Sequence, residues 1–159
     1  MFIAAWLIIL GVLIAFFSGV LDKQYNPNEQ INTVVSPLGT EIMLKQNKMG
    51  HYVASGLING KPVVFLLDTG ATRVTVPQHL AIKLNLTPGR KSRAMTANGV
   101  VTVADTVIKQ LSLGGIEFEN VSASINPGMK NNEILLGMSV LKELELIQRG
   151  EQLTIRAVN

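Results

Sequence analysis

Cysteine is absent from this sequence of 159 residues, and histidine and aspartate are scarce, with two His and three Asp. Without cysteine the chain forms no disulfide, no thiolate metal site and no cysteine nucleophile. His51 and His79 are too few for a histidine-based metal centre, and no His-Glu-x-x-His pattern is present. We therefore expect neither a metal nor a cofactor.

Charge is also sparse, with a formal net charge of +3. The basic residues are scattered along the sequence, and their only cluster, Arg90, Lys91 and Arg93, follows a Pro-Gly pair. No aromatic residue interleaves with this cluster, so the pattern favours a solvated turn over a nucleic-acid surface. We expect no nucleic-acid partner.

The first 21 residues carry no charged side chain. At ~1.5 Å per residue, a helix of this length crosses a hydrocarbon core of ~30 Å. No Lys or Arg precedes the apolar run and no small-x-small site precedes Asp22, which favours a permanent anchor over the alternative, a cleaved signal peptide. We predict a transmembrane anchor over 1–21, an irregular polar tether over 22–40 and one folded domain over 41–159. Lys23, just after the span, slightly favours a cytoplasmic domain.

From residue 41 onward, short β-type runs alternate with turn signals. Asn59-Gly60 and Asn98-Gly99 each separate two such runs, which is typical of a tight hairpin. This pattern of short strands and turns predicts an all-β barrel or sandwich with little helix. The expected strands are 41–45, 52–58, 61–67, 74–76, 94–97, 100–107, 108–113, 116–124, 134–136 and 153–158; the expected helices are 78–84 and 138–146, and 85–93 is expected to be a loop.

The run Val63–Leu67 is wholly apolar and leads directly into Asp68-Thr69-Gly70-Ala71-Thr72. Such a run predicts a strand buried on both faces. A carboxylate at the end of a buried strand is costly unless it is paired or its pKa shifts. Asp68 is therefore a candidate catalytic residue; the alternative is a turn aspartate that accepts backbone N–H bonds.

Three motifs occur in order: the Asp-Thr-Gly-Ala-Thr run, the Asn98-Gly99 hairpin and the apolar strand end Leu135-Leu136-Gly137, followed by a short helix. Over about residues 50–155 this order resembles the retropepsin-like aspartic proteases of clan AA, particularly the single-domain, membrane-anchored bacterial members. The resemblance implies a closed β-barrel with one short C-terminal helix, behind a single N-terminal transmembrane helix. It also implies an aspartic endopeptidase that binds a protein or peptide substrate as an extended strand.

The resemblance assigns roles to particular residues. Asp68 becomes the catalytic residue, and Thr69, Gly70 and Ala71 form the active-site loop. A substrate-binding flap would have Ala97, Asn98 and Gly99 at its tip; an ordinary β-turn is the alternative. Pepsin-like members usually have serine where this chain has Ala71, and that hydroxyl stabilises the carboxylate anion. We therefore expect activity nearer neutral pH than that of pepsin.

One chain supplies only half of an aspartic dyad. Of the other aspartates, Asp22 lies in the tether, and Asp105, in Val-Ala-Asp-Thr-Val, is expected to be a solvated strand residue. The resemblance implies a homodimer that places two Asp68 side chains face to face, with 153–158 as a candidate dimer strand. It further implies a bacterial inner-membrane protein with a periplasmic domain, which we adopt over the bias from Lys23. The alternatives are a non-catalytic dimerisation or peptide-binding module, and a protease whose only substrate is itself.

Overall fold

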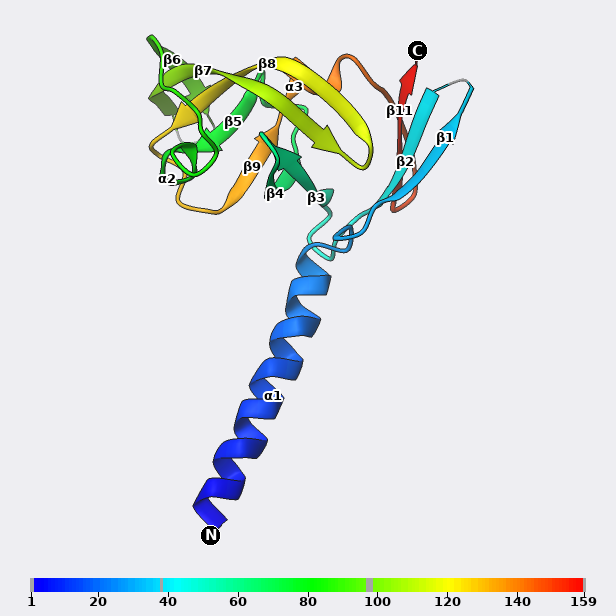
Figure 1. Ribbon diagram of the computed structural model, residues 1–159, viewed down its shortest axis with the longest axis vertical. Coiled ribbons are helices and arrows are strands. Elements are labelled where there is room, and N and C mark those ends of the chain that lie inside the picture. Colours follow the sequence, from blue (N-terminus) through cyan, green and yellow to red (C-terminus); the bar gives the residue numbers. More distant parts are fainter. Residues whose placement is uncertain (1, 38, 97–98, 159) are drawn as a thin grey trace.

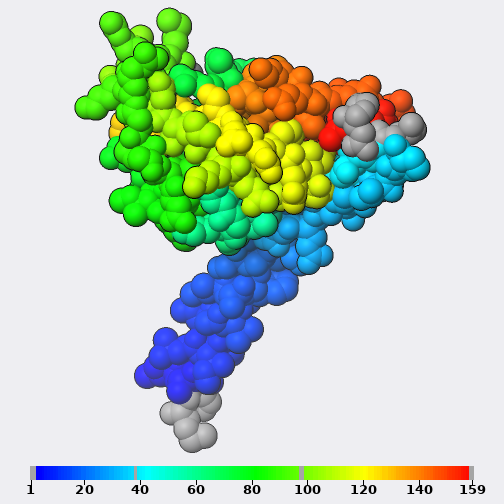
Figure 2. Space-filling view, turned by 45° about the horizontal axis from the view of Figure 1, so that its top comes forward, coloured from blue at the N-terminus to red at the C-terminus, as the bar shows by residue number. Residues whose placement is uncertain are grey.

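The computed structural model describes residues 2–37, 39–96 and 99–158. It consists of a long N-terminal helix, α1 (Phe2–Tyr25), and a β-rich body from which this helix projects as a stalk (Figures 1 and 2). The side chains of α1 are almost all exposed, and Ile3–Tyr25 is long and apolar enough to cross a membrane; a signal sequence has the same properties.

A seven-stranded sheet forms most of the body, in the order β3-β4-β9-β5-β8-β7-β6. Strands β4 and β9 run parallel, as do β5 and β8, and β3 also pairs with β7, which curls the sheet back on itself. The strands are β3 (Val53–Ile58), β4 (Lys61–Leu67), β5 (Val74–Pro77), β6 (Lys91–Thr96), β7 (Gly99–Leu113), β8 (Ile116–Asn126) and β9 (Glu133–Leu136). Two short helices, α2 (Gln78–Ala81) and α3 (Met138–Leu141), complete this part.

A second sheet of four strands lies beside the first, in the order β1-β2-β11-β10 (Figure 1). Its strands are β1 (Asn32–Ser36), β2 (Gly39–Lys45), β10 (Glu145–Arg149) and β11 (Gln152–Val158), and all neighbours are antiparallel. The two sheets share one apolar core, in which the larger sheet contributes Phe65 and Ile134 and the smaller contributes Ile42 and Ile155, all fully buried. Each such side chain contributes about 1.5–3 kcal/mol by leaving water.

The hairpin expected at Asn59-Gly60 is confirmed. Asn59 and Gly60 both have positive φ, 50° and 75°, and join β3 to β4 with Ile58 opposite Lys61. This is the geometry that makes Asn-Gly a hairpin signal, because both central residues of the turn adopt left-handed backbone. The strand predicted over 61–67 is β4, with the same bounds. It is not buried on both faces as expected: Phe65 is its only fully buried residue, and its other residues are half-buried or exposed.

Several predicted elements are corrected. Helix 78–84 ends at Ala81, and helix 138–146 ends at Leu141, after which β10 begins at Glu145. The predicted loop 85–93 already enters β6 at Lys91, and the two predicted strands over 100–113 are the single strand β7. The short C-terminal helix that the resemblance implied is thus α3, and α2 precedes it in the described part of the body.

The segment 22–40 was expected to have no regular structure, but β1 lies within it, and asparagines on either side of β1 are built into the body. Asn28 is buried: its amide nitrogen donates to Lys45 O (2.9 Å) and Val53 O (2.7 Å), and its Oδ1 accepts from Lys45 N (2.7 Å). Asn26 donates to Ser55 Oγ at 2.9 Å, and Asn47 donates to Tyr25 O at 3.0 Å. We call Asn26, Asn28 and Asn47 the asparagine junction; it fastens the end of α1 to the body.

Candidate active site

The loop that follows β4 presents Asp68 at the end of a strand whose position is fixed by its neighbour. Leu67 pairs with Leu136 of β9 in parallel register, and Asp68 N donates to Leu136 O at 3.1 Å. Gly70 N then donates to Asp68 Oδ1 at 2.9 Å, and Ala71 N donates to Asp68 O at 3.2 Å. These bonds turn the chain tightly and hold one carboxylate oxygen in place. Asp68 is half-buried, whereas Thr69 and Gly70 are exposed.

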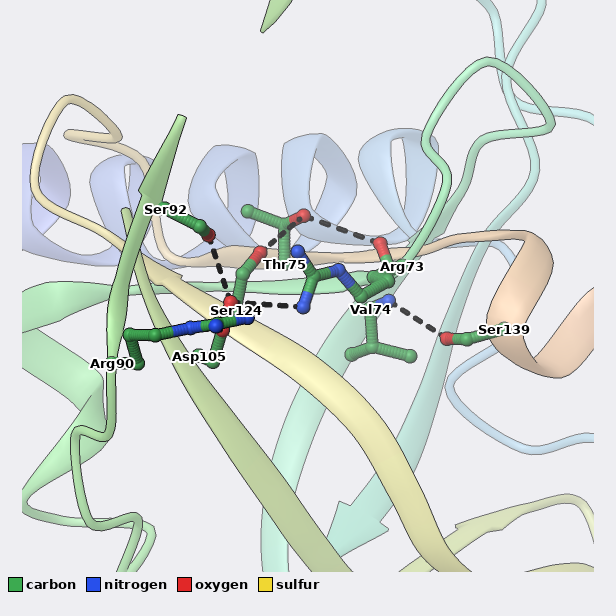
Figure 3. Close-up of polar contacts among 8 residues, drawn as sticks. All are labelled: Arg73, Val74, Thr75, Arg90, Ser92, Asp105, Ser124 and Ser139. Atoms are coloured by element: carbon green, nitrogen blue, oxygen red, sulfur yellow. Dashed lines mark hydrogen bonds and ion pairs between the residues drawn. The ribbon is translucent and has the colours of Figure 1, made fainter. Parts of the chain in front are cut away.

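The start of α3 braces this loop from behind. Met138 N donates to Ala71 O (2.8 Å) and Ser139 N donates to Thr72 O (3.0 Å). A Cβ at Gly137 would lie 2.6 Å from Ala71 O, so only glycine allows this approach. The strand end at 135–137 and the start of α3 thus hold the loop in place from one side. Ser139 Oγ also accepts a hydrogen bond from Val74 N at 3.0 Å (Figure 3).

A cleft of about 860 Å³ opens beside Asp68. The active-site loop forms one wall, and the β6–β7 hairpin forms another. Asp68 is the only acidic side chain among the described residues that line the cleft. The lining residues include Thr72, Arg73, Arg93, Met95, Val101, Val103, Asn126 and Met129.

The hairpin expected at Asn98-Gly99 is present in its described part. β6 and β7 pair antiparallel from Lys91 opposite Ala104 to Thr96 opposite Gly99, and Gly99 has a φ of 103°. Ala97 and Asn98 lie outside the described residues. The hairpin borders the cleft, and its role as a substrate flap stays a prediction.

Asp105 was expected to be solvated, which is wrong. Its side chain is 28% exposed and forms an ion pair of 2.9 Å with Arg73, and Ser92 Oγ donates to it at 2.8 Å (Figure 3). The Ser92 hydrogen bond, followed by the hydrogen bond and positive charge of Arg73 and the charge of Arg90, lowers the pKa of the Asp105 carboxyl below its ordinary value. Sequence reasoning missed Arg73 and Ser92; the available signal was an acidic residue in the middle of a strand of valine, alanine and threonine.

A second and larger cavity, of about 1180 Å³, lies between α2, β7 and the segment after β8. Its described lining contains no carboxylate; His79, which borders it, hydrogen-bonds to Asn132 at 3.0 Å. Nowhere in the described ranges do three His, Asp or Glu side chains gather as they would to hold a metal ion. The cleft beside Asp68 is therefore the candidate active site.

The fold and the loop geometry define the class of protein: this is a retropepsin-like fold. A crystal structure of a retropepsin-like aspartic protease from Rickettsia conorii superposes with a TM-score of 0.62 and 23% identity, covering 80% of this chain and 94% of that one. The EIAV protease in complex with the inhibitor HBY-793 superposes with a TM-score of 0.50 and 22% identity, over 62% of this chain and 92% of that one.

Residues 54–143 match the model of the gag-polyprotein putative aspartyl protease family, and the chain belongs to this family. The predicted resemblance is thus confirmed. Curated relatives include an uncharacterized protein of Sinorhizobium sp, 28% identical over 97% of this chain and 72% of the relative. An uncharacterized protein of Rickettsia prowazekii (strain Madrid E) is 26% identical over 96% of this chain and 69% of the relative.

Proposed function

We propose that this chain is a membrane-anchored aspartic endopeptidase that works as a homodimer, with Asp68 as its catalytic residue. One observation carries the proposal: Asp68 stands at the end of β4, fixed by Leu136 O and Gly70 N, in a cleft that the β6–β7 hairpin borders. This placement gives a half-buried carboxylate access to a groove large enough for a peptide.

A second copy would complete the chemistry. Two carboxylates a few Å apart do not both ionise, so one would activate a water molecule while the protonated one donates to the peptide carbonyl oxygen. Thr69 and Gly70 are exposed, so the loop offers an uncovered face to a symmetry mate. Two-fold pairing would place Asp68 of both chains at the axis, and the pair would titrate as a unit.

The terminal strand is not free for such a dimer. β11, the predicted dimer strand, pairs with β2 on one side and with β10 on the other, both within the same chain. A second copy would reach this sheet only along the outer edge of β1 or β10. Of these, β1 exposes Val34 and Val35, and apolar edge strands are prone to pair with another chain.

The membrane assignment is supported by the way α1 continues into the body. The asparagine junction binds the carbonyl of Tyr25, so the helix end is part of the folded structure, which favours an anchor over a removed signal. We propose an inner-membrane anchor with a periplasmic domain. Reporter fusions at the C-terminus test this: activity of a periplasm-dependent reporter supports the placement, and activity of a cytoplasm-dependent reporter alone contradicts it.

The activity itself is tested on the full chain in detergent micelles. Wild type and Asp68→Asn are incubated with a peptide library from pH 4 to 8, and the molecular mass is measured under the same conditions. Asp22→Asn is the matched control, because it removes a carboxylate outside the cleft. Cleavage by wild type and Asp22→Asn that is lost in Asp68→Asn supports the proposal. A folded dimer that cleaves nothing would contradict it.

A non-catalytic module for peptide binding or dimerisation is the second candidate function. The observation that favours it is that the described cleft contains a single carboxylate while both edges of β11 are occupied within the chain. The same library experiment distinguishes the two functions. If wild type and Asp68→Asn are folded monomers that bind library peptides equally well, and neither protein cleaves them, the binding module is established.

A further inference from the structure

The base of the β6–β7 hairpin is joined to the active-site loop by one carboxylate. Asp105 Oδ1 accepts from Arg73 Nη1 at 2.9 Å and from Ser92 Oγ at 2.8 Å, and Arg90 Nε lies 3.9 Å from Oδ2 (Figure 3). We call Arg73, Arg90, Ser92 and Asp105 the Asp105 cluster. Its members come from three places that are separate in the sequence.

The three segments that carry these residues also form the walls of the cleft, so their relative position sets its shape. Arg73 follows the active-site loop directly, Ser92 lies on β6, and Asp105 lies on β7. Arg73 also lines the cleft together with Asp68. The side chain of Asp105, on β7, therefore contacts β6 and the segment that follows the candidate catalytic residue.

Backbone bonds hold the same end of the hairpin. Gly89 N donates to Asp105 O at 2.7 Å, and Asp105 N donates to Arg90 O at 2.9 Å. Towards the other end, Met95 is 89% exposed and Val100 is 62% exposed. The hairpin is thus fastened at its base, and Met95 and Val100 near its other described end face solvent, so a change of angle at the base moves the far end most.

The ion pair is partly shielded from water. The Arg73 and Asp105 side chains are 35% and 28% exposed, whereas Arg90 is 88% exposed. Fully exposed pairs contribute little to stability, and shielding together with hydrogen bonds strengthens a pair. Arg73 and Ser92 are therefore the effective partners of Asp105, and Arg90 is a weak one.

We propose that Asp105 is a positioning residue that sets the angle of the β6–β7 hairpin over the cleft through its bonds to Arg73 and Ser92. The proposal rests on the proposed function and takes this hairpin as the predicted flap over a bound peptide. Asp105 does not touch the substrate; it acts through the hairpin. Its loss affects the capture of a peptide more than the chemical step.

The test compares wild type, Asp105→Asn and Ser92→Ala as full chains in detergent. Asp105→Asn keeps the shape and removes the charge, and Ser92→Ala removes one hydrogen bond while the ion pair remains. Glu119→Gln is the matched control, because Glu119 is an exposed carboxylate on β8. Hydrogen exchange is measured for the backbone amides of the hairpin and of β3 and β4, and KM and kcat are measured for a cleaved peptide.

In Asp105→Asn we expect hairpin amides to exchange about tenfold faster and KM to rise about tenfold, the factor that one charge-assisted hydrogen bond typically gives. We expect kcat to change less than about threefold. Exchange in β3 and β4 should rise less than exchange in the hairpin, since loss of the ion pair also lowers the stability of the whole fold. Ser92→Ala should show the same pattern at smaller size, and Glu119→Gln should match wild type.

Unchanged hairpin exchange in both variants would overturn the proposal, and so would an equal rise in β3 and β4, which would mean general destabilisation. If Asp105→Asn does not fold, Ser92→Ala decides by the same criteria. If no peptide is cleaved by any form, the proposed function fails, and the exchange data still decide whether Asp105 positions the hairpin.

Discussion

At the scale of single residues, Ala71 is the position at which the active-site loop departs from pepsin-like relatives. Its backbone donates to Asp68 O and accepts from Met138 N, but its methyl group offers no hydrogen bond to the carboxylate. We predict that Ala71→Ser shifts the acid limb of the pH–rate profile to lower pH, because an added hydroxyl stabilises the ionised form. Profiles of kcat/KM for the two proteins test this, and superimposable profiles would contradict it.

Asp105 gives a prediction about stability. Because its pKa is lower in the folded chain than in the unfolded chain, it stabilises the fold at neutral pH. That contribution is lost as the pH falls below the ordinary Asp value of about 4 towards the folded pKa. We predict that wild type has a higher Tm than Asp105→Asn at pH 7 and that the gap narrows below about pH 4. Thermal unfolding from about pH 7 to about pH 2.5 measures the gap, a range that spans the ordinary Asp pKa; a constant gap would be the contrary result.

The two aspartates show what sequence reasoning achieves for single residues. Asp68 was singled out as a candidate catalytic residue because a turn motif of fixed composition follows an apolar strand, and all of these residues are adjacent in the chain. The partners of Asp105 were missed because Arg73 is 32 positions away and Ser92 is 13 positions away. No local pattern carries such contacts. The same holds for the bond between Val74 N and Ser139 Oγ, which joins residues 65 positions apart.

At the scale of elements, the asparagine junction makes the segment after α1 part of the fold. Asn28 is buried and forms hydrogen bonds with the backbone of both β2 and β3. We predict that Asn28→Ala lowers the free energy of unfolding by about 3 kcal/mol, because it leaves the buried carbonyl of Val53 and the partly buried backbone groups of Lys45 without this partner. Chemical denaturation measures this. Asn32→Ala, at an exposed position of β1, is the control, and an equal effect of both substitutions would contradict the prediction.

Elements defined by local turn chemistry were predicted well, and those defined by distant pairing were not. The Asn59-Gly60 hairpin needs only its own residues. By contrast, Glu145–Arg149 was read in part as the continuation of a helix, and it is a strand because it pairs with β11 across the turn at Gly150. The same holds for β1, whose polar surroundings gave no strand signal and which forms by pairing with β2.

At the scale of the whole molecule, the proposed dyad requires a catalytic residue from each of two chains. We predict that mixing wild type with a ninefold excess of Asp68→Asn lowers the activity per wild-type chain to about one tenth, since random pairing leaves about one wild-type chain in ten with a wild-type partner. The proteins are mixed in detergent, allowed to exchange and assayed for peptide cleavage. Excess Asp22→Asn, which keeps Asp68, is the control and should not inhibit. Activity that is unaffected by Asp68→Asn would indicate a site within one chain.

The asparagine junction also bears on how the body would be released from the proposed membrane anchor. A cut near residue 40 would remove β1 together with Asn26 and Asn28. The backbone groups of β2 and β3 that Asn28 now satisfies would then lose their partners. A cut between Leu21 and Tyr25 would spare these bonds. A soluble form of the body that keeps the asparagine junction is therefore expected to begin at the end of the helix, between Leu21 and Tyr25.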